Sequence, residues 1–483
     1  MVFSSSIFLF VFLPIALLLY YVSPKHIKNT TLLSLSILFY AWGEVFYLGV
    51  MILSIVSNYF FGILIHNSQK ETHCNNLPKI YLVVGVGVNI ALLVSFKYAN
   101  FIADNINVIL SLLGAASVNL EPVHLPLGIS FFTFQAISYV VDVYRKEVLY
   151  QKNIFDLALY ISLFPQLIAG PIVRYHDVWQ QISNRSHSLN LFANGVQRFI
   201  FGLSKKMLIA NPLGEVADNI FVLTGNDLTM PLAWVGILAY TLQIFFDFSG
   251  YSDMAIGLGR MFGFRFNENF NYPYTSISLR EFWRRWHISL STWFRDYVYI
   301  SLGGNRVSTF RVYFNLLIVF VLTGFWHGAS WNFLIWGLFH GVFLAIEHAG
   351  FSNVLKRIYK PIQHLYLLTV VIIGWVFFRT DTLPLAATYL HAMFDISNFR
   401  TTYYQVAQVL SYEAVYVFVI GVIIAIPVYP FIRKLLINVV QQDLTKIAVF
   451  IYIPRLTILS SLLLLSFLKV ASSSYNPFIY FRF

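Results

Sequence analysis

Long apolar runs alternate with short polar segments along the 483 residues of the chain. A transmembrane helix needs about 20 mostly apolar residues, whereas a strand of a membrane barrel needs about ten and alternates in polarity. The runs lack that alternation, so they predict helices at Val45–Ile65, Ile80–Phe96, Met230–Phe248, Val312–Phe325, Leu365–Phe378 and Tyr412–Ile432. We predict an all-α polytopic membrane protein with roughly ten to twelve transmembrane helices plus re-entrant or interfacial helices.

The first apolar run, Ile7–Val22, predicts an uncleaved membrane span. Met1–Ser6 carries no positive charge, and the run ends at Tyr-Tyr-Val-Ser-Pro rather than at the small-residue cleavage site of a signal peptide. Lys25 and Lys28 follow at once, and positive residues favour the cytoplasmic side of a membrane. We therefore expect the N-terminus to lie outside the cytoplasm.

Composition supports a membrane protein. Hydrophobic residues make up 58% of the chain and charged residues 11%, against about 45–50% and about 25% in soluble domains. The net charge of +11 comes from basic residues between apolar runs, as expected of cytoplasmic loops, so no nucleic-acid partner is predicted. The single cysteine, Cys74, excludes an intrachain disulfide and a cysteine-cluster metal site.

The chain shows neither an internal repeat nor a linker of disordered composition. Transporter folds are commonly built from two related halves, so this weighs mildly against a transporter. We expect one membrane domain over residues 1–483, with residues 470–483 forming an extracytoplasmic tail.

The segment Leu279–Asp296 combines arginine, histidine and tryptophan residues. On one continuous helix, four polar side chains would lie within an arc of about 60°: Arg280, Arg284, His287 and Ser291. Glu281 and Arg285 are spaced to pair at i, i+4. The segment is too charged to span a membrane. Two interpretations stay open: an amphipathic helix that anchors the cytoplasmic face, or a basic stripe that binds a polyanion with His287 turned towards it.

A histidine in an apolar segment is the second candidate. His327 lies within Thr323–Gly341, and an ionisable group buried there is a functional candidate because its burial is costly. A hydrogen-bonded packing role remains the alternative, and His340 is expected to be structural. Gly337 and Gly341 form a small-xxx-small pair that allows close helix approach.

Two acids form the third set. Asp247 and Asp253 lie in an apolar segment, so each is expected to face a cavity or to pair with a basic residue. Arg260 is one candidate partner.

Several of these motifs together carry a family resemblance. They are Arg-Glu-Phe-Trp-Arg-Arg-Trp-His287, Gly-Gly-Asn-Arg306, Trp326-His327-Gly-Ala-Ser-Trp-Asn, Phe164-Pro-Gln-Leu-Ile-Ala-Gly-Pro-Ile-Val-Arg174 and Leu-Phe-Tyr40-Ala-Trp-Gly-Glu44. Together they resemble the membrane-bound O-acyltransferase family, in the branch of the alginate and peptidoglycan O-acetylation proteins. The resemblance runs from Phe39 to the C-terminus.

The resemblance implies a ring of tilted helices with funnels from both faces. It also implies transfer of an acetyl or other acyl group from cytoplasmic acyl-CoA across a bacterial inner membrane, for O-acetylation of an envelope or exported polysaccharide. His327 corresponds to the family's general base and His287 to its second histidine. Arg280, Arg284 and Arg285 suit the CoA phosphates. No metal or redox cofactor is required.

The C-terminal segment, Tyr475–Phe483, has two interpretations. Aromatic residues at a membrane boundary are commonly anchors. Its ending, Phe-Ile-Tyr-Phe-Arg-Phe, resembles a terminal motif of the branch in which the tyrosine carries the acyl group. That resemblance implies acylation of Tyr480 and transfer from it to a glycan by a separate periplasmic acetyltransferase.

Other functions remain open. Within the family they are D-alanyl transfer to teichoic acid and acylation of a lipid or a protein. From another class, a secondary transporter or flippase for an anionic substrate would also use membrane carboxylates and arginines. It would not explain the two histidine motifs.

Overall fold

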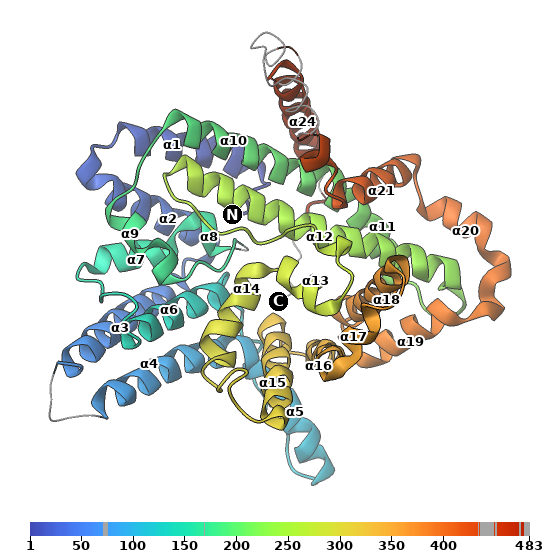
Figure 1. Ribbon diagram of the computed structural model, residues 1–483, viewed down its shortest axis with the longest axis horizontal. Helices are drawn as coiled ribbons and strands as arrows, with labels where there is room; N and C mark the ends of the chain where they lie inside the picture. Colours follow the sequence, from blue (N-terminus) through green and yellow to red (C-terminus); the bar gives the residue numbers. More distant parts are fainter. Residues whose placement is uncertain are drawn as a thin grey trace. The chain divides into compact units, whose positions relative to one another are not determined.

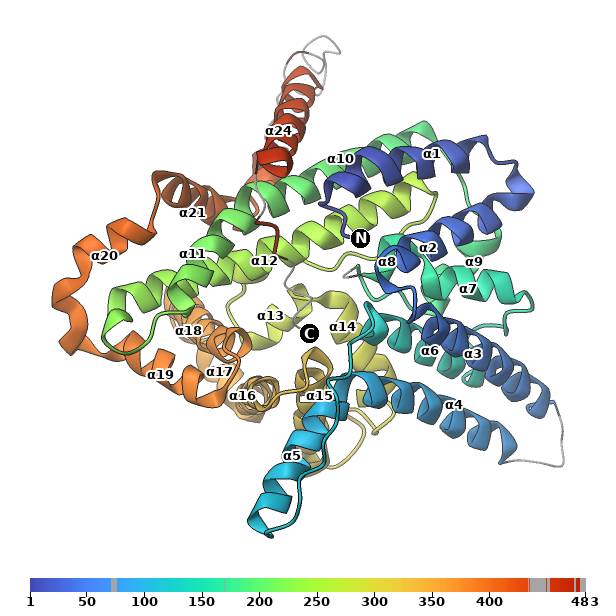
Figure 2. The ribbon, with the colours of Figure 1, turned by 180° about the vertical axis from the view of Figure 1, so that it is seen from behind.

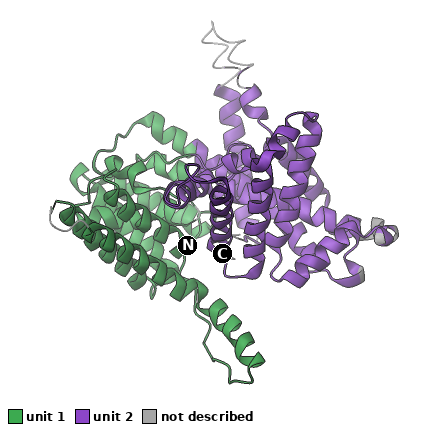
Figure 3. Ribbon diagram, turned by 60° about the horizontal axis from the view of Figure 1, so that its bottom comes forward, with its two compact units in different colours: residues 1–196, 255–267 green, residues 197–254, 268–483 purple. Residues whose placement is uncertain are grey.

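A computed structural model describes residues 1–70, 76–168, 170–432, 434, 449, 452–472 and 475–477. Within these ranges every regular element is helical (Figures 1 and 2). Contacts divide the chain into two compact units, Met1–Val196 with Ala255–Asn267 and Gln197–Met254 with Glu268–Phe483 (Figure 3). Cys74 and Tyr480 lie outside the described residues.

Unit 1 contains the N-terminal helices. They are η1 (Phe8–Phe12), α1 (Leu13–Val22), η2 (Lys25–Ile27), α2 (Lys28–Glu44), α3 (Leu48–Ser68), α4 (Leu77–Leu93), η3 (Val94–Tyr98), α5 (Ala99–Leu112), α6 (Ile129–Tyr144), α7 (Ile154–Ser162), α8 (Phe164–Leu167) and α9 (Tyr175–Ser183). Two further helices, α10 (Leu189–Ser204) and α12 (Met230–Met261), contribute residues to both units.

Unit 2 contains the remaining described helices. They are η4 (Lys205–Ala210), α11 (Asn211–Phe221), η5 (Gly225–Asp227), η6 (Pro273–Thr275), α13 (Leu279–Arg285), α14 (Ile288–Phe294), η7 (Arg295–Tyr299), α15 (Thr309–His327), α16 (Trp331–Ile346), η8 (Glu347–Phe351), α17 (Ser352–Leu355), α18 (Lys360–Arg379), α19 (Leu383–Phe394), η9 (Ile396–Thr401), α20 (Thr402–Val409), α21 (Tyr412–Ala425) and α24 (Ile453–Ser472).

Seven described helices are long and apolar enough to cross a membrane, and four shorter helices are also apolar. The fold is therefore the predicted all-α polytopic one, with its apolar segments divided between long and short helices. The helix predicted at Tyr412–Ile432 is interrupted, because α21 ends at Ala425 and helical structure resumes at residues 428–432. Ile426 has an extended backbone, as expected before Pro427, whose ring disfavours the helical conformation of the preceding residue.

In unit 1, α3, α4 and α6 pack against one another. Asn58 and Asn89 exchange hydrogen bonds between α3 and α4, with N···O distances of 3.0 and 2.8 Å. Both side chains are buried. Such reciprocal amide pairs set the register of two apolar helices, because a slipped register would leave buried amides unpaired.

In unit 2, α15 and α16 form a tightly packed pair that places His327 (Figures 1 and 2). A Cβ added at Gly324 would lie 2.2 Å from the Phe333 carbonyl oxygen, and one at Gly337 would lie 2.2 Å from that of Phe320. Only glycine allows the backbones to approach this closely. The close approach predicted from Gly337 and Gly341 is therefore confirmed.

Candidate active site

The segment Leu279–Asp296 is not the single helix that the sequence predicted. Helix α13 ends at Arg285, α14 begins at Ile288, and His287 between them has the left-handed backbone angles φ 44° and ψ 54°. The predicted arc of four polar side chains on one continuous helix was therefore wrong, because His287 and Ser291 lie beyond the end of α13, although Ser291 lines the same cavity as Arg280 and Arg284. A left-handed histidine is strained, so neighbouring contacts must hold it.

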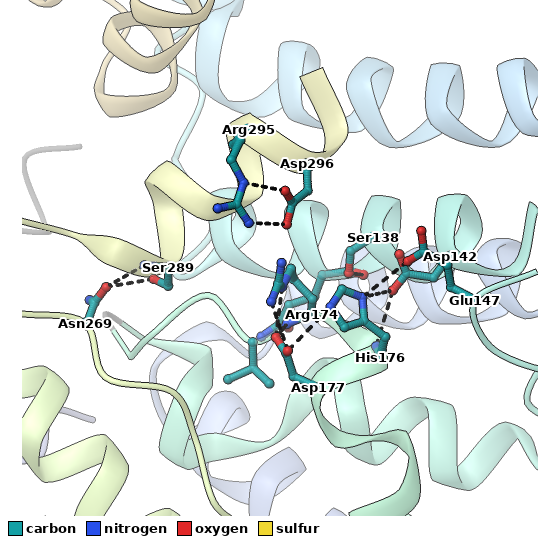
Figure 4. Close-up of polar contacts among 12 residues, drawn as sticks. Ser138, Asp142, Glu147, Arg174, His176, Asp177, Asn269, Ser289, Arg295 and Asp296 are labelled. Carbon is teal, nitrogen blue, oxygen red and sulfur yellow. Dashed lines mark hydrogen bonds and ion pairs between the residues drawn. The ribbon is translucent and has the colours of Figure 1, made fainter. Parts of the chain in front are cut away.

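Asn269 supplies those contacts. Its Oδ1 accepts hydrogen bonds from the Ser289 backbone nitrogen at 3.1 Å and from the Ser289 hydroxyl at 2.8 Å (Figure 4). Its Nδ2 donates to the Ser252 hydroxyl at 3.0 Å, and its own carbonyl oxygen accepts from the Ile288 nitrogen at 2.9 Å. The loop before α13 is thereby fastened to the start of α14 and to α12.

These contacts also determine the tautomer of His287. The Nδ1 atom of His287 lies 3.2 Å from the Asn269 Oδ1. A backbone N–H only donates, so the amide atom facing Ser289 is the oxygen. The Ser289 hydroxyl is 2.8 Å from this oxygen and 3.5 Å from Nδ1, so the shorter contacts favour an imidazole that donates to the oxygen from Nδ1. The proton then occupies Nδ1 and the lone pair occupies Nε2. Burial lowers the pKa of His287, which lies outside the candidate membrane spans, to about 3, so the ring is neutral.

His327 is the last residue of α15 and is 5% exposed. The rings of Trp336 and Phe378 each lie 5.1 Å from its imidazole, centroid to centroid. The His287 ring lies 6.4 Å away, and Phe248 contacts His287 at 4.5 Å. The structure thus brings the two predicted histidines together inside an aromatic cage.

A cavity of about 520 Å³ lies beside this cage. Arg280, Arg284 and Arg295 line it, and so does Thr323, one helical turn before His327. Arg295 also pairs with Asp296 at 2.7 Å (Figure 4). Sequence reasoning did not single out Arg295, although it lies in the same basic and aromatic segment.

Arg285 is placed differently from the other two predicted arginines. Its guanidinium pairs with Glu281 at 2.7 Å, which confirms the predicted i, i+4 pair. Arg285 is not among the residues that line the cavity.

Glu347 orients α13 at the edge of the cavity. Its carboxylate accepts hydrogen bonds from the backbone nitrogens of Leu279 at 2.7 Å and Arg280 at 3.0 Å. These groups belong to the first turn of the helix, whose N–H groups have no partner within it. Glu347 therefore fixes the position from which Arg280 projects. Sequence reasoning missed this residue, although an acid beside a long apolar run is a usable signal.

The two acids of α12 have basic partners, as the sequence predicted. Asp247 pairs with Lys206 at 2.7 Å. Asp253 pairs with Arg198 at 2.6 Å and with Lys205 at 2.7 Å, rather than with the suggested Arg260. The partners come from α10 and η4, so the correct pairing depends on how those helices pack.

A separate polar cluster lies in unit 1. The Nδ1 atom of His176 lies 3.0 Å from a carboxylate oxygen of Asp142 and 3.8 Å from one of Glu147 (Figure 4). The hydrogen bond to Asp142 raises the pKa of His176. Among the described residues this is the group of three whose ligand atoms lie close enough to hold a metal ion. Arg174 and Asp177 form an adjacent ion pair at 2.9 Å. The charged side chains of this cluster are therefore paired with one another.

Comparisons with known proteins agree with this architecture. The profile of the membrane-bound O-acyltransferase family matches residues 123–379. A probable alginate O-acetylase of Azotobacter vinelandii is 43% identical over all of both chains. A peptidoglycan O-acetyltransferase of Helicobacter pylori is 36% identical, over 82% of this chain and 80% of the relative. A teichoic acid D-alanyltransferase of Bacillus subtilis is 31% identical, over 45% of this chain and 58% of the relative.

The helices, the paired intramembrane charges and the histidine pair define a multi-pass membrane protein with a polar site inside an apolar helix assembly. The chain belongs to the membrane-bound O-acyltransferase family. It is therefore an acyltransferase.

The Asn269 contacts generate a testable prediction. Replacing Asn269 by Leu removes the acceptor of a buried backbone N–H, a loss that costs about 1–3 kcal/mol, and frees the His287 ring to change tautomer. The melting temperature should fall, and the His287 signal in imidazole ¹⁵N NMR should change from the Nδ1-protonated form to a mixture.

Ser252→Ala is the matched control, because it removes the partner of the Asn269 Nδ2 and leaves Oδ1 in place. It should keep the wild-type tautomer. An Nε2-protonated His287 in the wild-type protein would contradict the geometry.

Proposed function

We propose that the protein transfers an acetyl group from cytoplasmic acetyl-CoA through a bacterial inner membrane, for O-acetylation of a cell-envelope or exported polysaccharide. The observation that carries this proposal is the pair of buried histidines beside an arginine-lined cavity. Two relatives that match most of this chain are named a probable alginate O-acetylase and a peptidoglycan O-acetyltransferase. Their names support acetyl as the transferred group and a glycan as the final acceptor.

His327 acts as the general base in this proposal. A hydroxyl oxygen attacks the thioester carbonyl while its proton passes to the imidazole. The tetrahedral intermediate then collapses, the C–S bond breaks, and the proton leaves with CoA as the free thiol. The ester is formed without any metal or redox step. The rings of Trp336 and Phe378 pack against the imidazole, whose neutral form is the one able to accept a proton.

His287 lies next to His327 with its lone pair on Nε2, as the Asn269 hydrogen bond dictates. It acts as a second acceptor that orients the attacking hydroxyl or the protonated His327. Its low pKa makes it a weak base, so it accepts a hydrogen bond rather than the proton of the substrate.

The arginine-lined cavity receives the charged part of the donor. Guanidinium groups match phosphate oxygens in geometry and charge. The volume of about 520 Å³ is within the range of small-molecule sites. Arg280 and Arg284 are the proposed phosphate ligands, and Arg295 joins them. Arg285 was assigned the same role from the sequence, but its pairing with Glu281 favours a role in holding α13.

Tyr480 is the proposed first acceptor. Acetylation gives an aryl ester, and a phenol with a pKa of about 10 is a better leaving group than a sugar hydroxyl. A separate periplasmic acetyltransferase then catalyses attack by a glycan hydroxyl on this ester, which returns the phenol and forms the glycan ester. The large charged donor and the exported glycan thus stay on opposite sides of the membrane.

The central test is His327→Ala. Loss of a well-placed general base costs about 10²–10⁴-fold in rate, so turnover with radiolabelled acetyl-CoA should fall by that factor. The melting temperature should change little. His391→Ala, at an exposed histidine of α19, is the control and should retain wild-type turnover. Wild-type turnover in His327→Ala would refute the assignment.

Reversing the charges of Arg280 and Arg284 together should raise the KM for acetyl-CoA at least about tenfold. The difference should shrink at high salt, where screening weakens the interaction with phosphate. The control is Lys356→Glu with Arg357→Glu, which changes the net charge equally at exposed positions outside the cavity lining. Equal KM values for the two double variants would rule out the proposed phosphate site.

Tyr480→Phe should bind acetyl-CoA normally but form no acetyl adduct at the C-terminus. Glycan acetylation in cells should be lost with it, because the ring remains but the acceptor oxygen is absent. Intact-mass and peptide analysis after incubation with acetyl-CoA measures the adduct. Tyr452→Phe, at an exposed tyrosine before α24, is the control. Full glycan acetylation in cells that carry the Tyr480→Phe variant would contradict the acyl-carrier role. It would favour the alternative in which the tail is only a membrane anchor.

A further inference from the structure

The described part of the C-terminal segment, Tyr475–Pro477, is bound by polar side chains of unit 2. The Tyr475 hydroxyl donates a hydrogen bond to Asp218 at 2.6 Å. The Asn211 side-chain amide donates to the Tyr475 carbonyl oxygen at 3.3 Å and lies 3.4 Å from the Asn476 Oδ1. The Lys206 ammonium donates to the Pro477 carbonyl oxygen. Three successive residues therefore each have a partner.

Two of the side chains that bind the segment, Lys206 and Asp218, belong to ion pairs. Lys206 and Asp247 are 2.7 Å apart, and each side chain is 1% exposed. Asp218 pairs with Arg379 at 2.6 Å through one oxygen and accepts from Tyr475 through the other. A buried ion pair is weak evidence for stability, because desolvation offsets the attraction. Its remaining donors and acceptors need partners, and the tail backbone supplies one to Lys206.

These ion pairs are adjacent in sequence to the aromatic cage. Asp247 directly precedes Phe248, whose ring contacts His287. Arg379 directly follows Phe378, whose ring contacts His327. The ion-pair partners of Lys206 and Asp218 are thus each one residue away in sequence from a ring packed on one of the two histidines.

The two tyrosines of the tail differ in their chemistry. Burial, together with the hydrogen bond to Asp218, raises the pKa of the Tyr475 phenol, which stays a proton donor. Its oxygen is already engaged with a carboxylate. Tyr475 is therefore suited to anchoring the tail and poorly suited to attacking a thioester.

We propose that Lys206, Asn211 and the Asp218–Arg379 pair form a docking site for the chain's own C-terminal segment. The site holds the segment beside the histidine pair while the acyl group is loaded. The inference rests on the proposed acyl-carrier role of Tyr480. Lys206, Asn211, Asp218 and Tyr475 are positioning residues, because they hold the acceptor in place without contacting the reacting atoms.

Two variants test the site without leaving a buried charge unpaired. Tyr475→Phe removes only the hydroxyl that binds Asp218. Lys206→Met with Asp247→Leu replaces the whole ion pair by apolar side chains, a change that is often neutral for stability. The control is Lys205→Met, which removes a neighbouring cation and leaves Asp253 paired with Arg198. Lys206→Arg keeps the positive charge and should restore docking.

The first measurement is independent of catalysis. Purified protein is digested with carboxypeptidase, and loss of C-terminal residues is followed by intact mass. Tyr475→Phe should release residues about fivefold to tenfold faster than wild type, as expected for one lost hydrogen bond. The Lys206 and Asp247 double variant should be at least as fast. Equal rates in wild type and both variants would overturn the docking site.

The second measurement is acetylation of the tail at saturating acetyl-CoA. Both docking variants should lower its rate about tenfold while the dissociation constant for acetyl-CoA stays unchanged. A tail that is released but acetylated at the wild-type rate would overturn the positioning role. If wild-type protein forms no tail adduct at all, the acyl-carrier role of Tyr480 fails, and the digestion rates still decide whether the tail is docked.

Discussion

Charged and amide side chains within apolar helices must find partners in the protein, because lipid offers none. This constraint accounts for much of the architecture. Asn58 and Asn89 satisfy each other between two helices of unit 1. In unit 2, Asp247 is neutralised by Lys206. Each such pair fixes the rotation of its two helices about their axes. The direction in which neighbouring aromatic side chains of those helices point is fixed with it.

The histidine pair depends on the same rule. His287 adopts a strained backbone conformation that Asn269 holds through Ser289. The same amide oxygen accepts from the imidazole and decides which nitrogen carries the proton. One side chain thus sets both the backbone path and the proton position of the residue next to His327. Strain at His287 is compensated by a hydrogen-bond network that reaches back to α12.

The sequence predicted what depends on local pattern. The apolar runs predicted the long helices, and the sequence motifs around His287 and His327 identified both histidines as candidates. The sequence analysis missed the break at His287, because the helical periodicity of a segment carries no signal for a left-handed residue. That conformation depends on the side-chain amide of Asn269, which is distant in sequence. The sequence showed that Asp247 needed a basic partner, but Lys206 lies on another helix and only packing selects it. The early end of α21, by contrast, was readable in Pro427.

The three arginines of α13 show why residue type alone does not define a site. Arg280 and Arg284 line the cavity, whereas Arg285 pairs with Glu281. Helical geometry separates adjacent residues by about 100°, so neighbours in sequence face different surroundings. Glu347 fixes the start of α13 and hence which arginines face the cavity. Carboxylates also lie near these cations, since Arg295 pairs with Asp296 and Glu347 lines the same cavity. The cavity is lined by apolar side chains as well as by these arginines, and Thr323 in its wall lies one helical turn before His327, so α15 connects the arginines to the aromatic cage.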